Sequence, residues 1–212
     1  MTRLAPLELN KSLQETIRSL EKDFPSISNE RRIVLNELTE FIQNKSDNDE
    51  PVNLVFICTH NSRRSHISQI WAQAAAAHYG IQQVHSFSGG TEATALNPRA
   101  VKAMQEAGFE IYATDQSSNP TYEVKFSNDA PPLRAYSKKY DANVNPQNGF
   151  AAIMTCSHAD ENCPVVIGME KRISLPYNDP KDFDGTPLEA AKYAERVREI
   201  GREILFAFSK VK

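Results

Sequence analysis

One short run of the chain combines a thiol nucleophile with groups that bind an oxyanion. It reads Cys58-Thr59-His60-Asn61-Ser62-Arg63-Arg64-Ser65. Between a strand and a helix, such a loop wraps backbone N–H groups around a tetrahedral oxyanion, while the guanidinium of Arg64 binds two of its oxygens. The helix N-terminus and the two arginines favour the thiolate of Cys58, which is the reactive form of the thiol. The spacing predicts covalent chemistry on an oxyanion; the alternative is an inert cysteine that ends a core strand.

Alternating strands and helices surround this run. The pattern predicts four parallel strands in a doubly wound α/β domain with helices on both faces. The expected strands are 52–57, 84–88, 150–155 and 172–177, and the expected helices are 65–79, 98–108 and 187–208. Ligands of such sheets bind at the carboxyl ends of the strands, which is where Cys58 and Cys156 both fall.

The remaining segments are expected to be additions to this domain. Residues 1–50 read as a helical extension, a hairpin of two polar-faced helices, and residues 51–212 as the catalytic domain. Residues from about 119 to 149 interrupt the rhythm of strands and helices and read as an inserted hairpin. We expect the N-terminal pair to be a packing extension.

The composition excludes several classes of function. The chain has 212 residues, 40% of them hydrophobic, and its 24 basic and 27 acidic residues form no long run of one sign. Nucleic-acid binding is therefore not expected. No apolar run approaches the roughly 18 residues of a membrane span, and residues 1–10 lack a signal core. We expect a cytoplasmic protein without membrane contact, in which three cysteines serve thiol or metal chemistry.

The second and third cysteines are seven positions apart, in the segment from Cys156 to Cys163. If this segment is a helix, their Cα atoms are about 10 Å apart, beyond the limit of about 7 Å for a disulfide, so a bridge requires the helix to unwind. The three thiols fit a relay in which Cys58 attacks the oxyanion, Cys156 displaces the adduct and Cys163 resolves the first disulfide.

Two other uses of these cysteines stay open. Cys156, His158 and Cys163, with His60, are a candidate zinc set, although zinc cysteines are usually closer in sequence. Either thiol can also serve simply as a small packing residue.

Together these features resemble the arsenate reductases that share the low-molecular-weight protein tyrosine phosphatase fold and are recycled by thioredoxin. The resemblance covers residues 53–209. The motifs that carry it are the loop 58–65, Ser88-Gly89-Gly90-Thr91, Asn97-Pro98-Arg99-Ala100-Val101, Cys156 with Cys163-Pro164, and Asp179-Pro180. The late cysteine pair is its specific part, because a phosphatase of this fold needs only the loop and the aspartate.

The resemblance implies a role for individual residues. Cys58 is the nucleophile, Arg64 holds the oxyanion, Ser65 stabilises the thiolate and Asn61 shapes the loop. Asp179 is the general acid, although Asp before Pro is also ordinary turn chemistry. Asp182 and Asp184 are its rivals. The resemblance implies no bound cofactor or metal, and an external thiol reductant, either thioredoxin or a glutathione system.

Two loop residues depart from the pattern of the family. His60 stands where the family usually has glycine, so its backbone must avoid positive φ or rely on the limited tolerance of histidine for it. Arg63 stands where the family often has a second loop cysteine, which removes a side disulfide and adds positive charge near the sulfur.

Three functions follow from these expectations. The first is reduction of arsenate, with phosphate as an analogue of the substrate. The second is hydrolysis of phosphotyrosine through a Cys58 phosphoenzyme. The third is binding of an arsenical or a metal without turnover. Phe183 is the one ring evident near the expected site for stacking on an aromatic substrate, which favours the small oxyanion.

Overall fold

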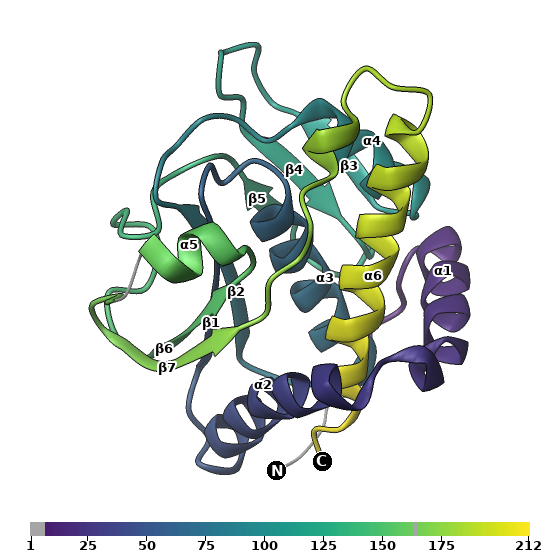
Figure 1. Ribbon diagram of the computed structural model, residues 1–212. Coiled ribbons are helices and arrows are strands. Elements are labelled where there is room, and N and C mark those ends of the chain that lie inside the picture. Colours follow the sequence, from purple (N-terminus) through teal and green to yellow (C-terminus); the bar gives the residue numbers. More distant parts are fainter. Residues whose placement is uncertain (1–6, 163–164) are drawn as a thin grey trace.

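The fold is built around a sheet of four parallel strands. The computed structural model describes residues 7–162 and 165–212. The strands β1 (Val52–Cys58), β2 (Val84–Gly90), β6 (Phe150–Met154) and β7 (Met169–Ser174) lie in the order β2-β1-β6-β7 (Figure 1). All three strand pairs are parallel, as predicted. Buried residues occupy nearly every position of β1 and all of β6, which is typical of parallel strands covered on both faces.

The last strand lies a few residues earlier than the predicted segment 172–177. After β7 ends at Ser174, the amides of Leu175 and Tyr177 still donate to the carbonyls of Met154 and Thr155, at 2.9 and 3.1 Å. Both side chains are buried. The chain therefore continues along the sheet after the strand has ended. Because this continuation is apolar, the sequence pattern placed the strand a few residues too late.

Helices cover the two faces of the sheet unequally. On one face α3 (Arg64–Tyr79) and α6 (Glu189–Ser209) form the main core with β1, and α4 (Pro98–Glu106) packs on α6. On the other face the short helix α5 (Ser157–Asn162) packs against β1 and β6. Helices on both faces are thus confirmed.

The helix boundaries follow local signals in the sequence. α3 ends at Gly80, whose φ of 67° is a left-handed conformation that glycine adopts without cost. α4 begins after Asn97, whose side chain accepts a hydrogen bond from the amide of Arg99 at 2.9 Å, with Pro98 in the first turn. Both ends were predicted from these residues.

The N-terminal segment consists of two helices, as predicted, with the short helix η1 (Phe24–Ser26) between them. They are α1 (Lys11–Lys22) and α2 (Asn29–Asp47), and each packs against α6. Figure 1 shows α1 alongside α6 and α2 crossing its C-terminal end, where the Thr39 hydroxyl donates to the carbonyl of Ala207 at 2.9 Å. Their apolar side chains belong to the same core as the sheet.

A second sheet lies between α4 and β6 in sequence. It contains β3 (Glu110–Ala113), β4 (Tyr122–Lys125) and β5 (Leu133–Ala135), all antiparallel. The predicted hairpin corresponds to β4 and β5. The sequence did not reveal β3, because three of its four residues are exposed and Ile111 alone gives it an apolar signal. Among the described residues no helix is long and apolar enough to span a membrane.

We predict that Gly201→Ala destabilises the fold. A Cβ at this position of α6 would lie 2.5 Å from Cε2 of Trp71, which is fully buried on α3. Alanine normally stabilises a helix relative to glycine by about 1 kcal/mol, but overpacking here should reverse the sign and cost about 1–3 kcal/mol. Chemical denaturation measures the change.

The control is Ala191→Gly at an exposed position of α6. Because this position lies in the first turn of α6, the change should cost no more than about 1 kcal/mol through helix propensity. A stabilised Gly201→Ala protein would contradict the tight contact between α3 and α6.

Candidate active site

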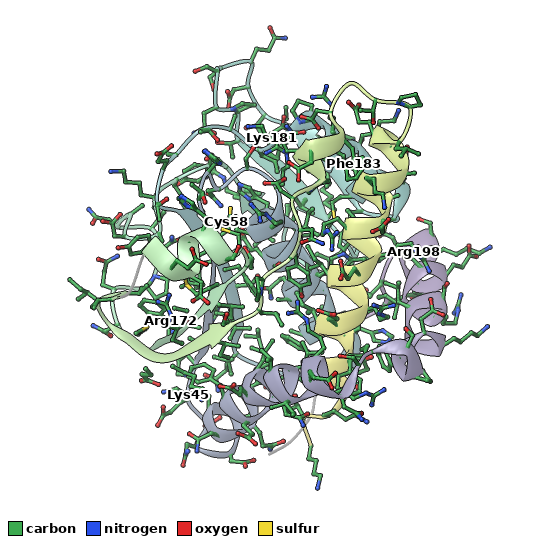
Figure 2. The ribbon with its side chains drawn as sticks, in the orientation of Figure 1. Lys45, Cys58, Arg172, Lys181, Phe183 and Arg198 are labelled. Atoms are coloured by element: carbon green, nitrogen blue, oxygen red, sulfur yellow. The ribbon has the colours of Figure 1, made fainter. Side chains whose placement is uncertain are left out.

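Two buried thiols lie at the same edge of the main sheet. Cys58 is the last residue of β1, and Cys156 follows the end of β6 by two positions. Because Ile57 lies opposite Met154 in the parallel pair, the two cysteines leave the sheet side by side. Both belong to one cluster of buried residues, and neither forms a disulfide. Figure 2 shows Cys58 near the short helix α5. The predicted third thiol, Cys163, lies outside the described residues.

The loop after Cys58 is shaped by Asn61. This residue has a φ of 44°, a left-handed conformation that asparagine tolerates better than most side chains. His60, which stands where the family usually has glycine, does not have a positive φ. The left-handed residue of the loop is instead Asn61, one position later. Gly90 is also required, because a Cβ there would lie 2.7 Å from the backbone nitrogen of Asn61.

A chain of hydrogen bonds connects Asn61 to Cys58, the predicted nucleophile. The Asn61 side chain accepts from the amide of Lys138 at 2.8 Å and donates through Nδ2 to Oγ of Ser65 at 2.9 Å. Ser65 Oγ lies 3.1 Å from the sulfur of Cys58. Since Asn61 already donates to this hydroxyl, the serine proton is left to point at the sulfur. The structure therefore places Ser65 where it can donate a hydrogen bond to Cys58.

The segment after β5 supports the loop from outside. The hydroxyl of Ser137 donates to the carbonyl of His60 at 3.2 Å, and the amide of Gly90 donates to the carbonyl of Lys138 at 2.9 Å. The side chain of Lys138 is buried, and this burial lowers its pKa to about 8. Sequence reasoning missed this support, because backbone contacts between distant segments leave no local pattern.

Arg64, the predicted oxyanion ligand, is held between two acceptors. Its Nη1 donates to the carbonyl of Tyr177 at 2.9 Å, and its Nη2 to Oδ2 of Asp179 at 2.7 Å. The structure therefore brings the predicted general acid to the predicted clamp. To bind an oxyanion through its terminal nitrogens, Arg64 must share or exchange these contacts.

Asp179 also has the turn role that its sequence suggested. Its Oδ1 accepts from the amide of Lys181 at 3.1 Å at the start of η2 (Pro180–Phe183). Of its two rivals, Asp182 is exposed and Asp184 accepts from the hydroxyl of Tyr193 at 2.8 Å. Asp179 is the one of the three that bonds to Arg64 in the described structure.

Arg63 points toward α6 and the segment from Asp179 to Asp184. Its Nε donates to the hydroxyl of Tyr193 at 2.8 Å, and its guanidinium lies 3.6 Å from Asp184 and 3.9 Å from Asp179. Burial is the main cause that raises the pKa of Tyr193 to about 12, so this phenol stays a neutral hydrogen-bonding group. The charge of Arg63 is thus shared with two carboxylates.

The remaining loop residues face different neighbours. Thr59 Oγ1 lies 3.5 Å from the sulfur of Cys156 and 3.3 Å from Nδ1 of His158. His60 Nε2 is 3.9 Å from a carboxylate oxygen of Glu92. Ser62 is buried, and its carbonyl accepts from the amide of Asn97 at 2.9 Å, which ties the loop to the start of α4.

The helix predicted between the late cysteines is present as α5. It is anchored to β7, because Arg172 donates from Nη2 to the side chain of Asp160 at 2.7 Å and to its carbonyl at 2.6 Å. Ser174 also donates to the Asp160 carboxylate. Within residues 7–162 and 165–212, no group of three or more His, Cys, Asp or Glu side chains is placed to hold a metal ion.

We predict that His66 makes the fold sensitive to acid. It is buried behind the loop, where burial first and Lys138 second lower its pKa to about 3. Below about pH 6.5 the imidazole of His66 is protonated in the unfolded chain but stays neutral in the folded protein. The free energy of unfolding should therefore fall as the pH drops from about 6.5 toward 3, by up to about 1.4 kcal/mol per pH unit.

Glutamine stays neutral over this range, so His66→Gln should flatten the pH dependence of unfolding measured with denaturant. The exposed His85 provides the matched control, since His85→Gln should keep the wild-type slope. Parallel stability curves for wild type and His66→Gln would show that burial does not exclude the proton.

We also predict that Arg172→Gln loosens α5. Losing hydrogen bonds from a charged donor to Asp160 should speed hydrogen exchange of the α5 amides by roughly tenfold. The neighbouring Lys171→Gln is the control, because Lys171 pairs instead with Glu37 on α2 at 2.8 Å. Equal exchange in both variants would mean that the Asp160 contact does not hold the helix.

Comparison with known proteins agrees with this geometry. Residues 53–128 match the family model of low molecular weight phosphotyrosine protein phosphatases. The arsenate reductase of Bacillus licheniformis is 32% identical over 155 residues, which cover 71% of this chain and 91% of that protein. The arsenate reductase of Bacillus subtilis is 31% identical over 152 residues, with the same coverage.

One solved structure shows the same fold. It is the crystal structure of a low molecular weight phosphotyrosine phosphatase from Vibrio cholerae O395, with a TM-score of 0.50 at 12% identity. The match covers 74% of this chain and 94% of the phosphatase. The chain thus has buried thiols at adjacent strand ends, and it matches arsenate reductases over most of the length of those proteins. It belongs to the arsenate reductase family, which has the fold of low molecular weight phosphotyrosine phosphatases.

Proposed function

We propose that this protein reduces arsenate to arsenite through a relay of its own thiols. The observation that carries the proposal is the second buried thiol, Cys156, at the strand end next to the Cys58 loop. Hydrolysis of a phosphate ester needs one nucleophile and water, so its chemistry does not require a second thiol at this place. It is the group that a reduction requires, because two electrons must come from a pair of sulfurs.

In the first step, Cys58 attacks the arsenic atom of a bound arsenate. The amides of the loop from Thr59 to Ser65 and the guanidinium of Arg64 bind the oxyanion. A sulfur–arsenic bond forms, an arsenic–oxygen bond breaks, and the departing oxygen leaves as water. Asp179, which already bonds to Arg64, supplies a proton to that oxygen. No electron has yet been transferred.

In the second step, the thiolate of Cys156 attacks the sulfur of Cys58. The sulfur–arsenic bond breaks and its electron pair stays on arsenic, which leaves as arsenite, while the two cysteines become a disulfide. Cys163 then attacks Cys156, so that Cys58 is released and a Cys156–Cys163 disulfide forms. The sequence predicts that this bridge requires the helix between the two cysteines to unwind, because seven residues of helix would hold their Cα atoms about 10 Å apart.

An external dithiol must then reduce the final disulfide. Thioredoxin, or a glutathione system, is the proposed partner, and the proposal needs no bound cofactor. Its place in the cell is the cytoplasm, where thiols are kept reduced. The substrate is a small tetrahedral oxyanion, and phosphate should compete with arsenate because the two are alike in shape and charge.

Hydrolysis of phosphotyrosine is the second candidate function. The Arg64–Asp179 pair favours it, since a clamp and an acid next to a thiol nucleophile are sufficient for a phosphoenzyme mechanism. Phe183, the ring expected near an aromatic substrate, is partly buried, and the Lys192 ammonium lies 5.3 Å from its centre. Binding of an arsenical without turnover is a third possibility, and it predicts stoichiometric uptake.

One assay separates the three functions. Arsenate is supplied with thioredoxin, thioredoxin reductase and NADPH, and the consumption of NADPH is followed. We expect steady turnover by the wild type and about one cycle or less by Cys163→Ser, because its Cys58–Cys156 disulfide is not resolved. A parallel assay with glutathione and glutaredoxin identifies the reductant.

Hydrolysis of an aryl phosphate is the control reaction. It should be weak, should persist in Cys163→Ser and should disappear in Cys58→Ser, which lacks the nucleophile. Undiminished arsenate turnover by Cys163→Ser would remove its resolving role. Strong aryl phosphatase activity without arsenate turnover would favour the phosphatase, and binding without either activity would favour the third function.

A further inference from the structure

Three polar groups form a row from the buried thiol to the surface. The sulfur of Cys156 lies 3.5 Å from Oγ1 of Thr59, and the same oxygen lies 3.3 Å from Nδ1 of His158. Only 1% of Cys156 is exposed, Thr59 is partly buried, and His158 is exposed. The row therefore connects a sulfur with almost no access to water to an imidazole that is in contact with water.

We propose that His158 accepts, through the hydroxyl of Thr59, the proton that Cys156 must lose before it attacks Cys58. This inference rests on the proposed function, in which Cys156 is the second nucleophile. A thiol attacks as its thiolate, and a buried thiol needs a route for its proton. Histidine is the side chain that exchanges protons most readily near neutral pH.

The hydrogen-bonding capacities of the three groups permit this transfer. A hydroxyl accepts and donates at once, so Thr59 can take the proton of Cys156 while it passes its own proton to Nδ1 of His158. Neutral His158 must then carry its proton on Nε2, which leaves Nδ1 as an acceptor.

After transfer, each group of the row reverses its role. His158 becomes an imidazolium that donates to Thr59, and Thr59 donates to the thiolate. The amide of Ala159 lies 3.4 Å from the same sulfur and adds a second donor to it. When Cys156 bonds to Cys58, the imidazolium releases its proton to water or to the departing arsenite. No electrons move until the sulfur–sulfur bond forms.

Other ionisable groups on the surrounding elements have different partners. Asp160 is bonded to Arg172 and Ser174, and His60 lies near Glu92. Arg64 is bonded to Asp179. Glu161 is exposed on α5, and β6 carries no ionisable side chain. Within the described residues, Thr59 is the polar side chain recorded in contact with the sulfur of Cys156, so the route to His158 is the one that the geometry provides.

A single-turnover experiment tests the relay. Cys163→Ser protein is mixed with arsenate between pH 5.5 and 9, and formation of the Cys58–Cys156 disulfide is followed by quenching and mass analysis. Adding His158→Asn, which keeps a polar group near the position of Nδ1 but exchanges no proton, should slow disulfide formation about 100-fold near pH 7. The rate should recover at high pH, where hydroxide removes the thiol proton.

Three further measurements separate this effect from a structural one. His158→Asn should leave hydrolysis of an aryl phosphate unchanged, because that reaction uses Cys58 and not Cys156. His85→Asn, at an exposed histidine on β2, should change neither reaction. Added imidazole should partly restore the rate of His158→Asn. Disulfide formation at the wild-type rate in His158→Asn near pH 7 would overturn the relay.

A readout without arsenate distinguishes failure of the relay from failure of the proposed function. In Cys58→Ser/Cys163→Ser protein, Cys156 is the remaining thiol, and its thiolate absorbs in the ultraviolet. We expect His158→Asn to shift thiolate formation to higher pH. An unchanged titration would contradict the relay even if arsenate is reduced. A wild type that forms no arsenite, combined with a shifted titration, would contradict the proposed function and leave the relay supported.

Discussion

The parallel pairing of β1 with β6 is the constraint on which the rest of the site depends. The two strands are almost 100 residues apart in sequence, yet their register places Ile57 beside Met154. Burial of both strands fixes this pairing, since neither has a polar face that could turn to water. Because parallel neighbours end at the same edge, the pairing alone brings Cys58 and Cys156 together. α5 then follows directly from β6 and closes the site.

A second constraint is the fixed shape of the loop after Cys58. Its left-handed residue, Asn61, uses both ends of its amide, one to fix Ser65 and the other to bind the backbone of Lys138. Arg63 and Arg64 leave the loop toward the segment that carries Asp179, and their contacts hold this segment over the strand ends. Cys58 and the Arg64–Asp179 pair are therefore held by the same loop and by the segment that it contacts.

Much of this structure could be predicted from sequence, and the exceptions have physical reasons. The strand before Cys58, the end of α3 at Gly80 and the cap at Asn97 follow from apolar patterning and from residues with strong local preferences. β3 was missed because Ile111 is its one buried residue. The support of the loop by residues 137–140 was missed because its contacts, most of them to backbone atoms, join segments far apart in the chain.

Side-chain direction was the other limit of sequence reasoning. The sequence placed Arg63 in the loop after Cys58 but did not reveal that its guanidinium bonds to Tyr193, 130 positions later. It placed Thr59 in the loop without indicating that its hydroxyl faces Cys156. Such contacts depend on how strands and helices pack, which local preferences do not encode. The roles of Cys58, Arg64, Cys156, Cys163 and Asp179 stay predictions.

The bond between Asn61 and the backbone of Lys138 joins residues 77 positions apart, and its consequence concerns biosynthesis. A ribosome must release the chain well past residue 138 before this bond can close, and contacts between distant segments form slowly because the intervening chain has to be ordered first. The arrangement of Asn61 and Ser65 around Cys58 is therefore completed only after the chain beyond residue 138 has folded. The geometry of this loop depends on a segment synthesised long after it.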